Sequence, residues 1–239
     1  MSKNPSEPPK KNTTKILREG AKAAWPICLG YFPIGLALGV LARQAGLPWW
    51  AVAMMSVLVF AGSAQFICVA MLSAGATASA IIFTTFVVNL RHTLMSSALA
   101  VHLSGVSRLF LALFSYGVTD ESFAVNMARF RDGDWDRWRA LFVNHLANAV
   151  WFVATVSGSL VGQFVPDGAF GIDYALTAMF ICLLVFQVRG RIYILTGLLA
   201  ALISVAWFLL IPGDSYIVGA AVSAATLGYF LQRRYRMGK

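Results

Sequence analysis

The residue of greatest chemical interest is Arg91, which lies near the middle of an apolar run over about 78–101. An arginine near the centre of a bilayer costs about 3 kcal/mol on insertion scales, so a charge there usually serves a pathway. A helix advances about 100° per residue, so the neighbouring Asn89 and His92 share a polar stripe while Arg91 points elsewhere. Arg91 therefore needs its own partner. The plainer alternative is an ion pair that only holds a helical bundle together.

Two carboxylates, Asp120 and Glu121, interrupt another apolar run over about 109–130. Thr119 before them can cap a helix, and acids in the first turn suit the positive end of the helix dipole. Because Gly117 can end the preceding turn, the sequence predicts a helix that starts in mid-span. Half-helices that meet near the midplane are how many transporters hold ions and substrates. The alternative is a continuous helix whose acids face water at the membrane edge. We expect one of the two acids to neutralise Arg91.

A third cluster, Gly62-Ser63-Ala64-Gln65, places small residues and one amide inside the apolar run over about 49–72. Small residues are common where membrane helices pack closely, so this motif fits close packing and a broken-helix site equally well. If the helix breaks here, its freed backbone amides could receive an anionic group.

Composition identifies the class of protein. The chain is 59% hydrophobic and 12% charged, whereas soluble domains are about 45–50% apolar and about 25% charged. We therefore expect an all-α integral membrane protein of about eight transmembrane helices, some broken near the midplane. The apolar runs that predict them cover about 21–42, 49–72, 78–101, 109–130, 140–161, 174–188, 192–211 and 216–231.

The basic residues predict the orientation of these spans. With eight crossings, 16 of the 19 lysines and arginines fall on one side and two on the other, with Arg91 inside the membrane. Such an excess marks the cytoplasmic side, so both termini are expected in the cytoplasm. A single re-entrant span would invert the later loops and remove the excess. The net charge of +9 is thus a topology signal and does not indicate a nucleic-acid partner.

The chain divides into one membrane domain and two short tails. Residues 1–20 are polar and lysine-rich and are expected to form a disordered cytoplasmic tail. Residues 21–232 form a single polytopic transport domain, and residues 233–239 form a basic cytoplasmic tail. The three cysteines, Cys28, Cys68 and Cys182, stand singly, without metal-ligand spacing. No cofactor or metal is expected, and no ATP-binding motif is present.

The ordered motifs resemble a known family. The chain contains Ala61-Gly62-Ser63-Ala64-Gln65-Phe66, then Asn89-Leu90-Arg91-His92, then Thr119-Asp120-Glu121, with Tyr31-Phe32-Pro33-Ile34-Gly35 ahead of them. Over about 21–232 this set resembles the AzlC-type branched-chain amino acid exporters. The resemblance implies a bacterial inner-membrane exporter of amino acids of the valine, leucine and isoleucine class. It also implies a small hydrophobic AzlD-type partner subunit.

A zwitterionic substrate needs an anion for its ammonium group and hydrogen-bond donors for its carboxylate. We expect Asp120, ahead of Glu121, to bind the ammonium group. The amides around Gly62–Gln65, with Arg91, would receive the carboxylate, and Asn89 adds a polar contact.

Rings from four phenylalanines, Phe60, Phe66, Phe86 and Phe123, could contact an apolar substrate side chain. If export is driven by protons, a carboxylate is the expected carrier, with Asp120 first, and His92 would act as a relay or orienting partner.

Two alternatives from other classes stay open. An intramembrane enzyme could use His92, Asp120 and Glu121 as ligands or acid–base groups, but metal spacing such as His-Glu-x-x-His is missing. A non-transporting membrane subunit of another permease is the second alternative.

Overall fold

The computed structural model describes residues 13–133, 135–166 and 191–210, with isolated positions between 171 and 233, and contains no strand among them. The predicted all-α membrane class is confirmed. Among the described residues, four segments are long and apolar enough to cross a membrane. They belong to α1 (Thr13–Gln44), α4 (Ala78–Ala100), α7 (Arg137–Val161) and α9 (Arg191–Leu210). Cys182, half of the loop 162–173, most of the run 174–188 and part of the run 216–231 lie outside the described residues. Whether the chain crosses the membrane at 174–188 and at 216–231 therefore stays a prediction.

Two of the predicted spans each consist of two short helices. Residues 49–72 form α2 (Trp49–Leu58) and α3 (Gly62–Ser73), and residues 109–130 form α5 (Arg108–Tyr116) and α6 (Asp120–Arg131). Helices of 9 to 12 residues reach about 14–18 Å, which is about half of a 30 Å hydrocarbon core. The predicted mid-span breaks are confirmed.

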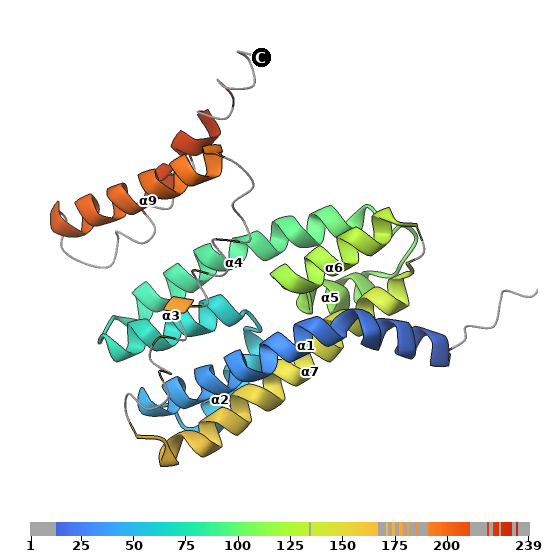
Figure 1. Cartoon of the computed structure of the whole chain (residues 1–239), viewed down its shortest axis with the longest axis horizontal. Helices are drawn as coiled ribbons and strands as arrows, with labels where there is room; N and C mark the ends of the chain where they lie inside the picture. Colours follow the sequence, from blue (N-terminus) through green and yellow to red (C-terminus); the bar gives the residue numbers. More distant parts are fainter. Residues whose placement is uncertain are drawn as a thin grey trace, which may run out of the picture.

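The first pair, α2–α3, enters and leaves at one end of the bundle (Figure 1). α2 follows the end of α1 after a short turn, and α3 joins the start of α4 through residues 74–77. The end of α4 lies at the opposite end, where Leu99 and Leu103 pack against Ala140 near the start of α7. Because α4 is straight, its start lies at the end of the bundle where α1 ends. The end of α3 and the start of α2 therefore lie at that same end.

The second pair, α5–α6, enters and leaves at the opposite end (Figure 1). The ring of Phe110 in the first turn of α5 packs edge-on against Trp138 in the first turn of α7. Arg129 in the last turn of α6 lies over the ring of Trp135, just before α7. Both outer ends of this hairpin therefore lie where α7 begins.

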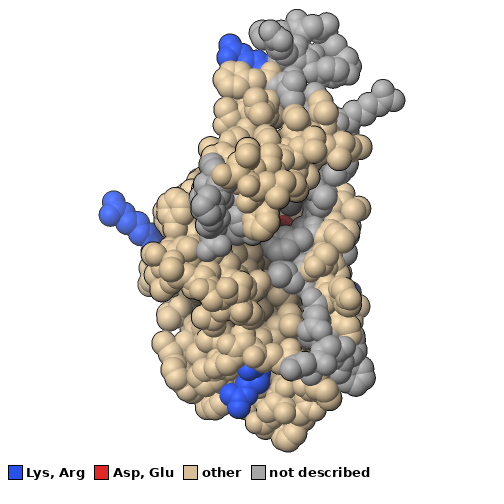
Figure 2. Space-filling view, turned by 90° about the vertical axis from the view of Figure 1, so that its left-hand side faces the viewer, with Lys and Arg blue, Asp and Glu red and all other residues tan. Residues whose placement is uncertain are grey.

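These two hairpins replace two of the expected crossings. Because two segments turn back and not one, the loop 129–139 remains on the same side as the start of α1. Arg108 moves to that side, which leaves Arg43 as the basic residue at the other end among residues 13–166. Figure 2, which looks at that other end, shows a largely uncharged face. Among residues 13–166 the basic residues outside the mid-span region therefore gather, apart from Arg43, at the end where α1 and α7 begin.

The hairpins pack against α1 and α7, which run side by side in the same direction (Figure 1). A Cβ added to Gly39 would lie 2.1 Å from the Thr155 carbonyl oxygen, and one added to Gly158 would lie 2.2 Å from the Leu36 carbonyl oxygen. Only glycine permits this approach, which is how small residues pack membrane helices. The helix pair therefore forms a closely packed support for both hairpins.

The chain from α5 to α7 repeats the chain from α2 to α4 in the opposite orientation. Helices of 10, 12 and 23 residues are followed by helices of 9, 12 and 25 residues. At a spacing of 59 positions, Ser56 corresponds to Ser115 and Asn89 corresponds to Asn148. Many transporters are built from such inverted repeats, with their sites at the repeat interface.

Candidate functional site

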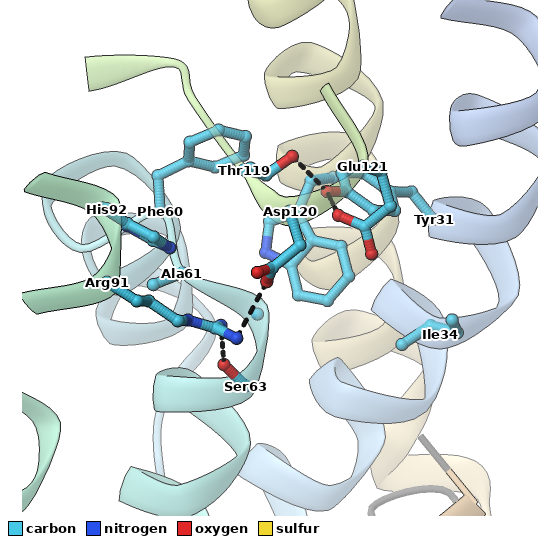
Figure 3. A pocket seen from close by; sticks show the side chains of 12 residues that line it. Tyr31, Ile34, Phe60, Ala61, Ser63, Arg91, His92, Thr119, Asp120 and Glu121 are labelled. Carbon is cyan, nitrogen blue, oxygen red and sulfur yellow. Dashed lines mark hydrogen bonds and ion pairs between the residues drawn. The ribbon is translucent and has the colours of Figure 1, made fainter. Parts of the chain in front are cut away.

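The tips of both hairpins meet at one mid-span pocket (Figure 3). Five parts of the chain contribute to its walls: Tyr31 and Ile34 of α1, residues 60–63 at the first break, Arg91 and His92 of α4, residues 119–121 at the second break, and Trp151 of α7. The structure thus brings together residues that lie up to 120 positions apart in the sequence.

Arg91 extends from the middle of α4 to both breaks. Its Nη1 lies 2.9 Å from Asp120 Oδ2, and its Nη2 donates to Ser63 Oγ (Figure 3). The two charged side chains are 29% and 30% exposed, so water screens the pair only in part. One guanidinium group therefore ties α3 to α6. The predicted pairing of Arg91 with one of the two acids is confirmed for Asp120.

Glu121 is held by a hydroxyl group. The Tyr31 hydroxyl donates to Glu121 Oε2 at 2.6 Å, and it lies 2.8 Å from Thr119 Oγ1. In the part of the chain that the structure describes, no lysine or arginine lies within ion-pair distance of Glu121. The pocket therefore sets one guanidinium group against two carboxylates, which suits a ligand that brings a positive charge.

The start of α6 is closed by its own side chains. Thr119 N donates to Ser122 Oγ at 2.9 Å, and Ser122 N donates to Thr119 Oγ1 at 3.3 Å. This reciprocal pair is a capping box, which satisfies backbone donors that a helix start leaves free. The predicted cap at Thr119 is confirmed.

The start of α3 has no such cap. Ala61 occupies the capping position with extended backbone and makes no side-chain hydrogen bond to the helix. Phe60 before it has a φ of +34°, a conformation that costs a non-glycine residue about 1–3 kcal/mol. The first N–H groups of α3, at Gly62 and Ser63, therefore lie at the pocket without a capping side chain. Such groups attract anions.

Two of the predicted site residues, Ala64 and Gln65, are fully buried behind the pocket wall. Gln65 Oε1 accepts from Trp151 Nε1 at 2.8 Å, and Gln65 Nε2 donates to Ser56 Oγ at 3.1 Å. Ser56 in turn lies 2.8 Å from Thr155 Oγ1. Gln65 therefore fixes the indole that lines the pocket and does not itself reach the cavity.

Asn89 and three of the four predicted phenylalanines lie away from the pocket. Asn89 does not contribute to the lining, and its buried Oδ1 has no hydrogen-bond partner within the described residues. Phe66 is buried in the core, Phe86 is 62% exposed, and Phe123 packs against the core around Phe114. Phe60 alone of the four lines the pocket.

Sequence reasoning gave no role in the site to Tyr31, Ile34 or Trp151. Tyr31 and Ile34 lie one turn apart on α1, within the segment Tyr31–Gly35 that carries part of the family resemblance. That segment was the available signal. Trp151 had none, since an isolated tryptophan in an apolar run is ordinary. Its ring meets Tyr31 edge-on at 5.2 Å, which joins the α1 and α7 walls.

No group of three or more histidine, cysteine, aspartate or glutamate side chains that could hold a metal ion occurs among the described residues. The pocket offers charges, hydroxyl groups and free backbone donors beside apolar rings. These are the contacts that a small charged or zwitterionic molecule with an apolar part requires.

Comparison with known proteins agrees with this arrangement. The family model of the AzlC protein matches residues 26–165. The branched-chain amino acid transport protein AzlC of Bacillus subtilis is 27% identical over 83% of this chain and 78% of its own length. The inner membrane protein YgaZ of Escherichia coli is also 27% identical, over 80% of this chain and 81% of its own. An uncharacterized membrane protein of Archaeoglobus fulgidus is 28% identical over 89% and 94%.

No solved structure matches the chain. The family match covers the whole pocket, from Tyr31 to Trp151. The chain therefore belongs to the AzlC family and is a membrane transport protein.

Proposed function

We propose that this protein is an inner-membrane secondary transporter that exports branched-chain and other small apolar amino acids. The observation that carries the proposal is the mid-span pocket in which Arg91 lies between the starts of two half-helices, one of which, α6, carries both carboxylates. The Bacillus subtilis relative is named as a branched-chain amino acid transport protein, which supports this substrate class.

The substrate carboxylate binds at the uncapped start of α3 in this proposal. The free N–H groups at Gly62 and Ser63 supply donors, and Arg91 supplies a positive charge beside Ser63. The dipole of α3 adds to the attraction, because the positive end of a helix stabilises an anion by about 0.3–1 kcal/mol or more when partly buried.

The substrate ammonium group binds at the start of α6. Sequence reasoning ranked Asp120 first for this role. In the structure Arg91 already pairs with Asp120, whereas Glu121 is held by the Tyr31 hydroxyl. We therefore place the ammonium group at Glu121, with Asp120 as the second carboxylate that keeps Arg91 in position.

The apolar side chain of the substrate contacts Ile34, Phe60 and Trp151. These side chains come from α1, the first break and α7, and all three line the pocket beside its charged residues. An aliphatic and aromatic wall suits a branched hydrocarbon side chain. It offers no partner to a charged substrate side chain. This wall favours valine, leucine and isoleucine over basic and acidic amino acids.

Proton exchange drives export in this proposal. A carboxylate at the pocket, Asp120 or Glu121, carries the proton, and His92 on the same wall orients or relays it. The small AzlD-type partner and a cytoplasmic location of both termini complete the proposal. They rest on the family resemblance and on the excess of basic residues where α7 begins.

Flux measured in proteoliposomes tests the proposal. The purified chain is reconstituted into liposomes, alone or with the small partner. The liposomes are loaded with labelled leucine, valine, isoleucine, lysine or glutamate, and efflux is followed under an imposed pH difference. We expect efflux of the three apolar amino acids and not of the charged ones. Glu121→Gln should reduce this efflux about 100-fold, and His92→Gln should retain more of it. Leu94→Ala, on the exposed face of α4, is the matched control.

Other results would assign the chain elsewhere. If no amino acid moves with or without the partner, the transport proposal fails and a non-transporting subunit becomes the better interpretation. If the rate of amino acid efflux does not depend on the pH difference, either in the unchanged chain or in Asp120→Asn, the coupling ion is not a proton.

A further inference from the structure

An open groove, lined by hydroxyl groups among apolar side chains, adjoins the pocket on the side where α4 and α5 face each other. Its walls include His92, Thr93 and Ser96 of α4 and Ser115 and Tyr116 of α5, and we call it the α4–α5 groove. His92 lines both this groove and the mid-span pocket. The groove extends from mid-span toward the end of α4, which is the end of the bundle where α7 begins.

We propose that the α4–α5 groove is a water-filled path that connects the substrate pocket with the cytoplasmic face, and that Tyr116 and Phe60 separate the two. This inference rests on the proposed transport function. It adds to that function the route by which an exported amino acid reaches the pocket.

The character of α4 changes at the point where the groove begins. Before Arg91, the exposed side of α4 carries Ile82, Phe86 and Leu90, which are 67%, 62% and 47% exposed. After it, a neighbouring part of the surface carries Thr93 and Ser96. Hydroxyl groups at membrane depth face protein or water rather than lipid, because hydrocarbon offers them no hydrogen bonds. One of the serines in this region, Ser97, bonds to the Thr93 carbonyl group at 2.7 Å and so carries no part of the argument.

The inverted repeat supports an interior role for these hydroxyl groups. At a spacing of 59 positions, Ser96 corresponds to Thr155 and Ser115 corresponds to Ser56. Ser56 and Thr155 are fully buried between α2 and α7, and their hydroxyl oxygens lie 2.8 Å apart. The equivalent residues between α4 and α5 instead line a groove, with Ser115 exposed. The same kind of interface is therefore closed in one repeat and open in the other.

The barrier between groove and pocket is an aromatic contact at the hairpin tips. The ring of Tyr116 lies 6.1 Å from that of Phe60, which lines the pocket. The Tyr116 hydroxyl donates to the Val57 carbonyl group at the end of α2 at 2.6 Å. His145 also stacks with Tyr116, with 6.3 Å between the two ring centroids. Tyr116 therefore joins the two tips between the groove and the pocket, and a substrate passing between them must displace it.

Cysteine reactivity tests whether water fills the groove. Single cysteines replace Ser96 or Ser115 in a chain whose three native cysteines are changed to alanine, and a permanently charged methanethiosulfonate reagent is added to inside-out vesicles. Leu94→Cys, at a 74% exposed position on the same stretch of α4, is the lipid-facing control. Thr155→Cys is the closed-interface control. We expect both groove cysteines to react at least tenfold faster than either control.

Equal and slow reaction at all four positions would overturn the proposal, because a charged reagent enters water and not lipid. A second measurement tests the connection to the pocket. Complete modification of Ser115→Cys should reduce leucine efflux at least tenfold, and unchanged efflux would also overturn the path. If the chain moves no amino acid while the reactivity pattern holds, the proposed substrate fails and the water-filled groove stands.

Discussion

The two hairpins share one backbone design and meet opposite electrostatic demands. Each places a 12-residue helix start at mid-span, at Gly62 in α3 and at Asp120 in α6. The start of α6 is capped by Thr119 and Ser122 and carries two acids, whereas the start of α3 is neutral and uncapped. A capped, acidic start is prepared for a cation, and an uncapped start with free N–H groups is prepared for an anion.

This difference shows how a repeated fold can recognise an asymmetric ligand. A zwitterion has two unlike ends, and two identical helix starts would suit only one of them. Changing a few residues at one break supplies the second kind of end without changing the path of the backbone. Arg91 then connects the breaks, because it contacts Ser63 of one and Asp120 of the other.

The largest expected effect comes from removing that connection. Arg91→Gln leaves Asp120 partly buried without its cation, which should lower the free energy of unfolding by about 2 kcal/mol, since fully buried pairs lose about 3–5. Transport should fall below detection. Thermal unfolding in detergent measures the first effect, and proteoliposome flux measures the second.

The second acid provides the control. Asp120→Asn added to Arg91→Gln should recover most of the lost stability, whereas Glu121→Gln added to Arg91→Gln should not, because Glu121 bonds to Tyr31. Rescue by Glu121→Gln and not by Asp120→Asn would show that the ion pair does not stabilise the bundle.

The next largest effect tests whether the α6 start binds a cation through Glu121. Glu121→Gln keeps the size of the side chain and removes its charge, so flux should fall about 100-fold while the unfolding temperature changes little. Tyr31→Phe deletes one hydrogen bond to that carboxylate. Hydrogen bonds to charged groups contribute about 1.5–3 kcal/mol, and the lower end of that range corresponds to a fall in flux of about 10-fold. An effect of Tyr31→Phe equal to that of Glu121→Gln would contradict this ranking.

Much of the acidic half of the site could be predicted from the sequence, because its signals are local. The adjacent residues Thr119, Asp120 and Glu121 together indicate a helix start. An arginine in an apolar run predicts a carboxylate partner. The breaks followed from small and capping residues in mid-span. The hairpins did not, because a run of about 22 apolar residues looks the same whether it crosses the membrane or turns back. Positive-inside counting could not separate the two paths, since two turns leave the later loops unchanged.

The apolar half of the site was largely beyond sequence reasoning. Phe60, Phe66, Phe86 and Phe123 are chemically alike, and only tertiary packing sends Phe60 to the pocket and Phe86 outward. Gln65 looked like a ligand-binding amide, yet its hydrogen bonds to Trp151 and Ser56 use it as support. Which face of a helix meets the cavity depends on contacts between segments far apart in the chain.

Removing the cap of α6 and adding one to α3 tests the difference between the two helix starts, with a smaller expected effect on stability. Thr119→Ala removes the α6 cap and should lower the free energy of unfolding by about 1 kcal/mol. Ala61→Ser offers α3 a cap at an extended position, so stability should rise by a similar amount. The added hydroxyl group also competes with a substrate carboxylate for the same N–H groups, so KM for leucine efflux should rise. A lower or unchanged KM in a more stable Ala61→Ser chain would contradict an anion site at α3.

The smallest effect concerns the glycine that starts α3. A Cβ at Gly62 would lie 3.0 Å from Cη2 of Trp151, and that ring cannot shift freely because its Nε1 donates to the buried Gln65. Gly62→Ala should therefore lower the unfolding temperature slightly, by the equivalent of about 0.5–1 kcal/mol, and shift the indole at the pocket wall. Gly30→Ala is the matched control, because a Cβ there meets nothing within 4 Å, and alanine favours a helix by about 1 kcal/mol. The tryptophan emission spectrum should change in Gly62→Ala and not in Gly30→Ala. If both variants are equally stabilised and spectrally silent, α3 does not start against Trp151, and its free N–H groups do not face the pocket that the two hairpins share.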